Sequence, residues 1–275
     1  MSNCKVIALT NQKGGVGKTT TAVNLGVGLV QQGKKVLLID ADAQANLTMA
    51  LGYNRPDDIP ITLSTVMQNI IDDKSFDVSQ GILSHSEGVD LLPSNIELSG
   101  FEVRLINAMS RERVLKTYVN EVKKSYDYVL IDCMPSLGMI TINALAAADS
   151  VVIPTQPHYL SAKGLELLLR TVSKVKRQIN PRLRIDGILM TMVMPRTNIS
   201  KDIISSVKSA YGQKIKVFDT QIPHSVRAVE ATAEGKSIFA YDKGGKVAAA
   251  YEQFAKEVVE IGEKQRKQNR ADRLR

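Results

Sequence analysis

The chain has 275 residues, of which 44% are hydrophobic and 23% charged, a balance typical of a soluble globular protein that excludes a disordered or collagen-like chain. Its formal net charge of +8 and its pI near 9.4 favour polyanionic partners such as nucleic acid or acidic membrane surfaces, without choosing between them. Two cysteines and three scattered histidines leave little material for a disulfide framework or for a zinc or iron–sulfur site.

Short apolar runs alternate with amphipathic stretches along the chain. Lys5–Thr10 and Lys35–Asp40 are typical of buried strands, and the helix between them is expected to end at Gly33. Further strands are expected in VDLLP, YVLIDC, SVVIPT and RIDGILMTMV, and helices in SRERVLKTYVNEVKKS, SAKGLELLLRTVSKVKRQI and SKDIISSVKSAY. Apolar strands separated by helices predict an α/β fold, a single doubly wound domain whose mostly parallel sheet has helices on both faces.

The chain is expected to divide near its C-terminus. A long helix is predicted from about Lys246, within a domain that spans residues 1–262, and residues 263–275 are predicted to form a basic tail. The last fourteen residues hold six basic side chains against two acidic ones, which fits either a frayed, solvated end or a binding arm. The N-terminus lacks the pattern of a secretory signal, and no apolar run approaches the length of a membrane span. We therefore expect a cytoplasmic protein with no integral membrane contact.

The strongest motif is NQKGGVGKTT, which follows an apolar strand and opens an amphipathic helix, the context of a phosphate-binding loop. Its glycines let successive backbone N–H groups face the phosphates, and the helix N-terminus adds partial positive charge. Lys18 is placed to reach the β- and γ-phosphates, and the Thr19 hydroxyl to ligate Mg²⁺. The motif therefore predicts an ATP site made by Gly14, Gly15, Val16, Gly17, Lys18, Thr19 and Thr20.

Carboxylates follow two further apolar strands. Asp40 and Asp42 lie in IDADAQANLT, where aspartates two residues apart at a strand's carboxyl end can both point toward a ligand, although aspartates also end strands as turn residues. Asp132 ends the apolar run in YDYVLIDCMPS, as in a Walker B strand whose carboxylate holds Mg²⁺ directly or through water. The neighbouring Cys133 is expected to be a buried small residue and not a reactive thiol.

The phosphate loop departs from the general motif, because Gln12 stands where that motif has its first glycine and Lys13 precedes the glycines. The pattern KGGVGKT resembles the deviant Walker A motif of the ParA/MinD-type P-loop ATPases. The resemblance extends over nearly the whole chain and includes the family's D-x-D-x-Q and D-x-x-P patterns. It implies a homodimer formed on ATP in which Lys13 reaches the partner's nucleotide and acts in catalysis with Lys18 and Asp42.

The resemblance also assigns roles to other residues. Asp42 is cast as the residue that positions the attacking water, while Thr19, Asp40 and Asp132 form the metal set, with Asp40 in the outer Mg²⁺ shell. Thr191 and Pro223 are the expected adenine-side residues.

DNA binding follows from the same resemblance. Arg196 and Arg227 correspond to DNA-contacting arginines of ParA-type relatives, and Lys243 and Lys246 are expected to extend that patch. Non-specific binding to double-stranded DNA needs cations against phosphates and no base-reading helix. Because only four residues precede the first strand, we expect no N-terminal helix-turn-helix, and sequence-specific recognition is left to a ParB-type partner.

The resemblance thus implies a nucleoid-associated partition ATPase that releases DNA on slow, partner-stimulated hydrolysis. A MinD-like membrane-cycling ATPase is the main alternative, but the tail offers only Ile261, Ala271 and Leu274 as apolar residues for a membrane-inserting helix. A metal-cluster carrier needs paired cysteines, which Cys4 and Cys133 do not provide. A switch that binds ATP without useful hydrolysis is disfavoured by the presence of Lys18 and Asp42.

Overall fold

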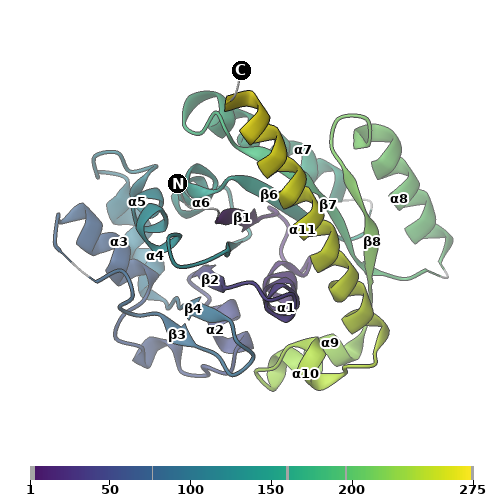
Figure 1. Cartoon of the computed structure of the whole chain (residues 1–275), viewed down its shortest axis with the longest axis horizontal. Coiled ribbons are helices and arrows are strands. Elements are labelled where there is room, and N and C mark those ends of the chain that lie inside the picture. The colour runs from purple at the N-terminus through teal and green to yellow at the C-terminus, as the bar shows by residue number, and fades with distance from the viewer. Residues whose placement is uncertain (1–3, 76, 159–160, 196, 274–275) are drawn as a thin grey trace.

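The computed structural model describes residues 4–75, 77–158, 161–195 and 197–273, which form one eight-stranded sheet between two layers of helices (Figure 1). The strands run in the order β3-β4-β2-β5-β1-β6-β7-β8, and every neighbouring pair is parallel except β3–β4. This architecture confirms the predicted fold class. The strands are β1 (Lys5–Leu9), β2 (Val36–Ala41), β3 (Leu83–Ser84), β4 (Asp90–Leu92), β5 (Tyr128–Cys133), β6 (Ser150–Thr155), β7 (Arg184–Val193) and β8 (Val217–Pro223).

Each face of the sheet is covered by its own group of helices, and each group closes a separate apolar core. One face is covered by α3 (Leu63–Ile71), α4 (Glu97–Leu105), α5 (Val114–Val122), α6 (Met139–Ala147), α7 (Ser161–Gln178) and α8 (Asn198–Tyr211). The other is covered by α1 (Lys18–Gln31), α2 (Asn46–Ala50), α9 (Val226–Ala233), α10 (Ile238–Tyr241) and α11 (Lys246–Arg273). A short 3-10 turn, η1 (Pro56–Asp58), lies in the loop after α2. None of the helices in the described ranges is both long and apolar enough to cross a membrane.

The burial of the four central strands explains why apolar runs in the sequence predicted them. Every residue of β1, β2, β5 and β6 is buried, since helices cover both faces. The segment Val217–Pro223 was not predicted as a strand, because its burial alternates and so gives no continuous apolar run. The short antiparallel strand β3 was missed as well.

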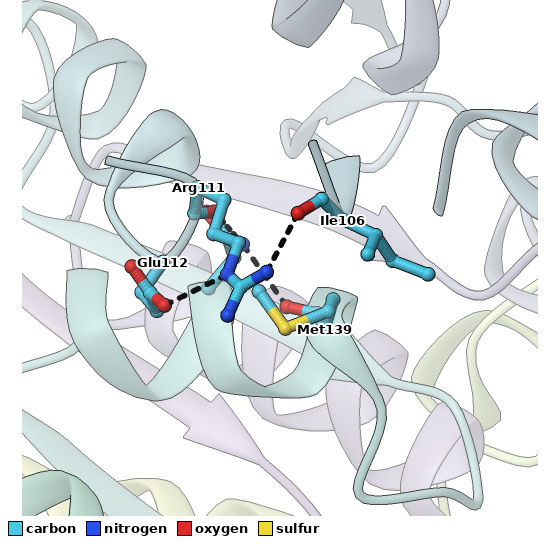
Figure 2. A network of polar contacts seen from close by, with 5 residues as sticks. Ile106, Arg111, Glu112 and Met139 are labelled. Carbon is cyan, nitrogen blue, oxygen red and sulfur yellow. Dashed lines mark hydrogen bonds and ion pairs between the residues drawn. The ribbon is translucent and has the colours of Figure 1, made fainter. Parts of the chain in front are cut away.

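The connection from α4 to α5 is held by polar contacts to main-chain groups. The Arg111 guanidinium donates to the Ile106 carbonyl at 2.6 Å and to Glu112 Oε1 at 3.1 Å (Figure 2). The side-chain amide of Asn143 in α6 donates to the carbonyls of Arg111 and Met139. These bonds fasten the loop to the helix that follows the Walker B strand.

The segment predicted as a basic tail continues α11, which is helical as far as Arg273. Phe254 and Tyr251 bury the middle of this helix in the core. Farther along, Gln265 Nε2 donates to Asp186 Oδ1 at 2.8 Å, and Asp186 forms a buried 2.6 Å ion pair with Lys5. The described part of the segment is therefore docked on the sheet, while the division of the chain at residue 262 stays a prediction.

Candidate functional site

The phosphate loop lies between the carboxyl end of β1 and the start of α1, at the edge of the sheet where the parallel strands end. Gly15 and Gly17 have φ angles of 69° and 77°, in the left-handed region that favours glycine. Gly17 is the N-cap residue of α1, so the first free N–H groups of this helix face the space enclosed by the loop. Gly14 and Gly15 are exposed, while Val16 is fully buried beneath them.

Side chains that follow β1 and β6 brace this loop. Asn11 accepts from the Lys13 N–H at 3.0 Å and donates to the Pro154 carbonyl at 2.7 Å. From the end of β6, Gln156 Nε2 donates to the Gly15 carbonyl at 2.9 Å. These bonds fix the loop backbone against β6, which keeps its N–H groups oriented for a bound anion.

Thr191, an expected adenine-side residue, lies beneath the phosphate loop. Its hydroxyl donates to the Val16 carbonyl at 2.8 Å, and it is buried in β7. Pro223 ends the neighbouring strand β8, where it pairs in register with Val193. The structure thus places both residues on the β7–β8 side of the loop, and their contact with adenine stays a prediction.

Lys18, Thr19 and Asp132 come together at the base of the loop. The Thr19 hydroxyl donates to Asp132 Oδ2 at 2.6 Å, and Lys18 Nζ lies 3.4 Å from the Lys13 carbonyl. Burial lowers the pKa of Lys18, while the charge of Asp132 opposes that shift. An ammonium held so close to the glycine loop is placed to meet phosphate oxygens.

Asp40 and Asp132 are neighbours across the paired strands β2 and β5, and both are buried. Burial raises the pKa of Asp40 to about 7, against hydrogen bonds from Thr48 and from the Asp42 N–H. Burial, followed by the charge of Asp40, raises the pKa of Asp132 to about 8. Two buried carboxylates at this spacing favour a cation between the phosphate loop and the strand ends.

The donor set fits Mg²⁺. Asp132 Oδ1 is buried without a hydrogen-bond partner among the described residues, and its other oxygen already contacts the Thr19 hydroxyl. Oxygen ligands of this kind suit Mg²⁺, which binds through one or two protein groups and completes its shell with waters and substrate phosphates. No cluster of three His, Cys, Asp or Glu side chains that could hold a metal ion by themselves occurs in the described ranges.

Asp42 follows β2 in a tight turn, so it is a turn residue as well as a candidate catalytic one. Its Oδ1 accepts from the Gln44 N–H at 3.0 Å, and Ala45, with φ 52°, completes the turn into α2. Its carboxylate contributes to the electrostatic environment of Lys18 and of Asp132. The structure thus brings Asp42 to the phosphate loop, and its role with water stays a prediction.

The DNA-binding candidates lie apart from the loop. Arg227 in α9 forms a 2.7 Å ion pair with Asp242, which directly precedes the exposed Lys243. Lys246, also exposed, begins α11. Arg196 lies outside the described residues.

Some supporting residues were not predicted. Thr48 donates two hydrogen bonds to Asp40 Oδ2, and Gln156 and Asn11 brace the phosphate loop. Thr48 lies eight residues after Asp40 in the same segment, Ile39–Thr48. This proximity in sequence is the one local signal that could have indicated the role of Thr48. Cys133 is buried, as expected for a small packing residue.

A glycine loop with two lysines, closed by a Walker B aspartate on a neighbouring parallel strand, defines a P-loop ATPase of the deviant Walker A class. The model of a family described as an AAA domain matches residues 4–185. Sporulation initiation inhibitor protein Soj of Bacillus subtilis is 46% identical over 259 residues, covering 94% of this chain and 99% of that protein. Chromosome partitioning protein ParA of Caulobacter vibrioides is 38% identical over 93% of this chain and 94% of that protein. The chain belongs to this Soj/ParA family of chromosome-partitioning ATPases.

Solved structures agree on the fold. Cobyrinic acid a,c-diamide synthase from Mycobacterium smegmatis, with bound ATP analogue and magnesium, matches with a TM-score of 0.81 at 36% identity, covering 93% of this chain and 94% of that one. The septum site-determining protein MinD from Pyrococcus horikoshii, complexed with Mg-ADP, matches with a TM-score of 0.70 at 25% identity, covering 93% of this chain and 96% of that one.

Proposed function

We propose that the protein is a DNA-partition ATPase that dimerises on ATP, binds double-stranded DNA non-specifically and releases it on hydrolysis. The observation that carries the proposal is the loop geometry: Lys18 turns inward against the loop backbone, whereas the Lys13 ammonium has no hydrogen-bond or ion-pair partner among the described residues. A second lysine without a partner in its own subunit is suited to a phosphate held by another subunit. Kinship with Soj and ParA supports the same function.

The chemistry proposed for the site is ATP hydrolysis. The loop N–H groups, the N-terminus of α1 and Lys18 bind the phosphates and offset their charge. Thr19 and Asp132 would hold Mg²⁺, which supplies electrostatic stabilisation to the transferred phosphoryl group. Asp42, fixed in its turn by the Gln44 N–H, orients the attacking water. Hydrolysis is slow, and a ParB-type partner stimulates it.

Non-specific DNA binding is assigned to the exposed cations near the start of α11, namely Arg227, Lys243 and Lys246, so that the protein associates with the nucleoid. Two subunits joined by ATP double the number of phosphate contacts, which strengthens binding steeply. The membrane-cycling alternative is less well supported, because Ile261, one of the three apolar residues available for a membrane-inserting helix, packs against the core. A membrane-inserting face needs such side chains to be free.

The test is binding of a random-sequence duplex with ATP, ADP or no nucleotide across a salt series. We expect ATP to strengthen binding in the wild type and in Asp42→Ala, which should lose only turnover. Arg227→Ala should reduce the slope of log K against log salt by about 1. Asp242→Asn breaks the same ion pair but leaves the arginine, so it should keep full binding. Binding in the wild type that ignores ATP would contradict the proposal.

A further inference from the structure

The edge of the sheet opposite the nucleotide gathers basic side chains from segments far apart in sequence. Because the main strands are parallel, the residues that precede each strand lie together at this amino edge. We define the amino-edge patch as six cations, all of them exposed except the half-exposed Lys34. The members of the patch are Lys34, Lys35, Arg182, Arg184, Lys264 and Lys267.

Main-chain hydrogen bonds connect this edge from one side to the other. The Asp127 N–H donates to the Lys35 carbonyl at 2.8 Å, and the Lys5 N–H donates to the Asp127 carbonyl at 2.9 Å. On the other side of β1, the Asp149 N–H donates to the Val6 carbonyl at 2.9 Å and the Arg184 N–H to the Asp149 carbonyl at 3.1 Å. These bonds tie the backbone of Lys35 and of Arg184 to the starts of the neighbouring strands.

The end of α11 belongs to the same edge. Gln265 is hydrogen-bonded to Asp186, whose carboxylate is paired with Lys5 at the start of β1. An added Cβ at Gly262 of α11 would lie 3.1 Å from the Tyr128 hydroxyl and 3.6 Å from Lys5 Cδ, so the helix packs on the starts of β5 and β1. The exposed Lys264 and Lys267 flank Gln265, so the docked helix adds them to the patch.

The acidic groups of this edge are largely engaged within the protein. Asp127 accepts from the Lys35 N–H and Asp149 from the Val6 N–H, both at 2.9 Å, while Asp186 is buried against Lys5. Glu260 and Glu263 are exposed on α11 and reduce the positive potential locally. The outward-facing side chains still carry a clear excess of positive charge.

We infer that the amino-edge patch is a second phosphate-binding surface, which contacts duplex nucleic acid without nucleotide. Lys35 directly precedes β2 and Arg184 begins β7, four places away in the sheet, a separation of about 19 Å. That span exceeds the roughly 12 Å width of a major groove, so the patch can meet phosphates of both strands. This inference deepens the proposed DNA-binding function and rests on it for the identity of the polyanion.

A lipid surface fits the patch less well. Interfacial binding by a basic face also needs apolar side chains to enter the headgroup layer. The most exposed large apolar residues in the described ranges are distant from the patch in the fold, on or beside α4, α8 and α9. They are Ile96, Val103, Met109, Ile199, Val226 and Val229.

The test uses the full chain without nucleotide and a fluorescent random-sequence duplex in a salt series. The double variants Arg182→Ala/Arg184→Ala and Lys264→Ala/Lys267→Ala should each lower the slope of log K against log salt by about 2. The control Lys74→Ala/Arg104→Ala removes two exposed cations near α3 and α4 and should leave the slope unchanged.

Each outcome decides the question. No nucleotide-free binding at low salt, or equal slopes in patch and control variants, would overturn the inference. If the patch variants lost binding to phosphatidylserine vesicles but kept duplex binding, the patch would be a lipid surface, and the inference would be overturned. Patch-dependent binding to which ATP adds nothing would support the patch while the proposed ATP-dependent function failed. ATP-dependent binding that requires Arg227 but not the patch would support the proposed ATP-dependent function and overturn the inference about the patch.

Discussion

Ionisation of the buried Asp132 carboxyl lowers the stability of the nucleotide-free protein. Because burial raises its folded-state pKa from 3.8 to about 8, the native state binds this proton more tightly than the unfolded chain does. Its contribution to stability is therefore full below its unfolded pKa and is lost as pH rises toward 8. Asp132→Asn removes the charge and keeps an oxygen acceptor for Thr19, so we predict a higher Tm in the absence of nucleotide.

The gain in Tm should be larger near pH 8 than at about pH 5. Each kcal/mol gained in the free energy of unfolding should raise Tm by about 2–4 °C. Circular dichroism melts at both values measure it, with the exposed Asp219→Asn as the matched control. The same variant should lose Mg²⁺-dependent ATP hydrolysis. An unchanged Tm near pH 8 would mean that the carboxylate is not destabilised by its burial.

At the level of single residues, the site residues that could be predicted from the sequence are those at or directly after the end of a strand. Asp40, Asp132 and Lys18 are brought together because parallel strands end at the same edge, a rule that needs no coordinates. Gln156 was missed because its hydrogen bond to Gly15 joins residues 141 positions apart. A contact made by tertiary packing leaves no local pattern to read.

At the level of secondary structure, β7 contains a close approach that tolerates only glycine. At Gly187, where φ is 158° and the register with β6 shifts, an added Cβ would lie 2.8 Å from both the Lys216 carbonyl oxygen and the Phe218 ring. We predict that Gly187→Ala destabilises the protein by about 2 kcal/mol or more, since β8 must move away. Urea unfolding measures the change.

The matched control is Gly100→Ala in α4, where an added Cβ meets nothing within 4 Å. Replacing an exposed helical glycine should stabilise by about 0.5–1 kcal/mol. If Gly187→Ala stabilised the protein as the control does, β7 and β8 would have adapted to the added methyl group.

The same edge of the sheet shows where prediction of elements failed. β8 buries Phe218, Thr220 and Ile222 and leaves Asp219 exposed, so its sequence alternates where the central strands are apolar throughout. The basic segment of α11 was predicted as a C-terminal tail because of its excess of positive charge, and that division of the chain stays a prediction. What places its described part on the sheet is the hydrogen bond from Gln265 to a buried aspartate 79 residues away.

At the level of the whole molecule, the proposed ATP-bridged dimer would make stability depend on protein concentration. Ligand binding to a monomer adds a stabilisation free energy set by the ratio of ligand concentration to Kd, about 2.7 kcal/mol at a hundredfold excess. Dimer formation makes the stabilisation depend on protein concentration as well. In an Asp42→Ala background, which is expected to prevent turnover, we predict that Tm with ATP and Mg²⁺ rises as the protein is concentrated. ADP or removal of Mg²⁺ by a chelator should abolish that dependence.

Variants of the two lysines in the phosphate loop distinguish ATP binding from dimer formation. Lys13→Ala should keep the ATP-induced rise in Tm but lose its dependence on protein concentration, because Lys18 still holds the phosphates within the subunit. Lys18→Ala should lose the rise altogether, and Lys74→Ala should behave like the parent. If Lys13→Ala retained the concentration dependence, the dimer would close through contacts other than this lysine, since nothing else in the variant has changed at the nucleotide.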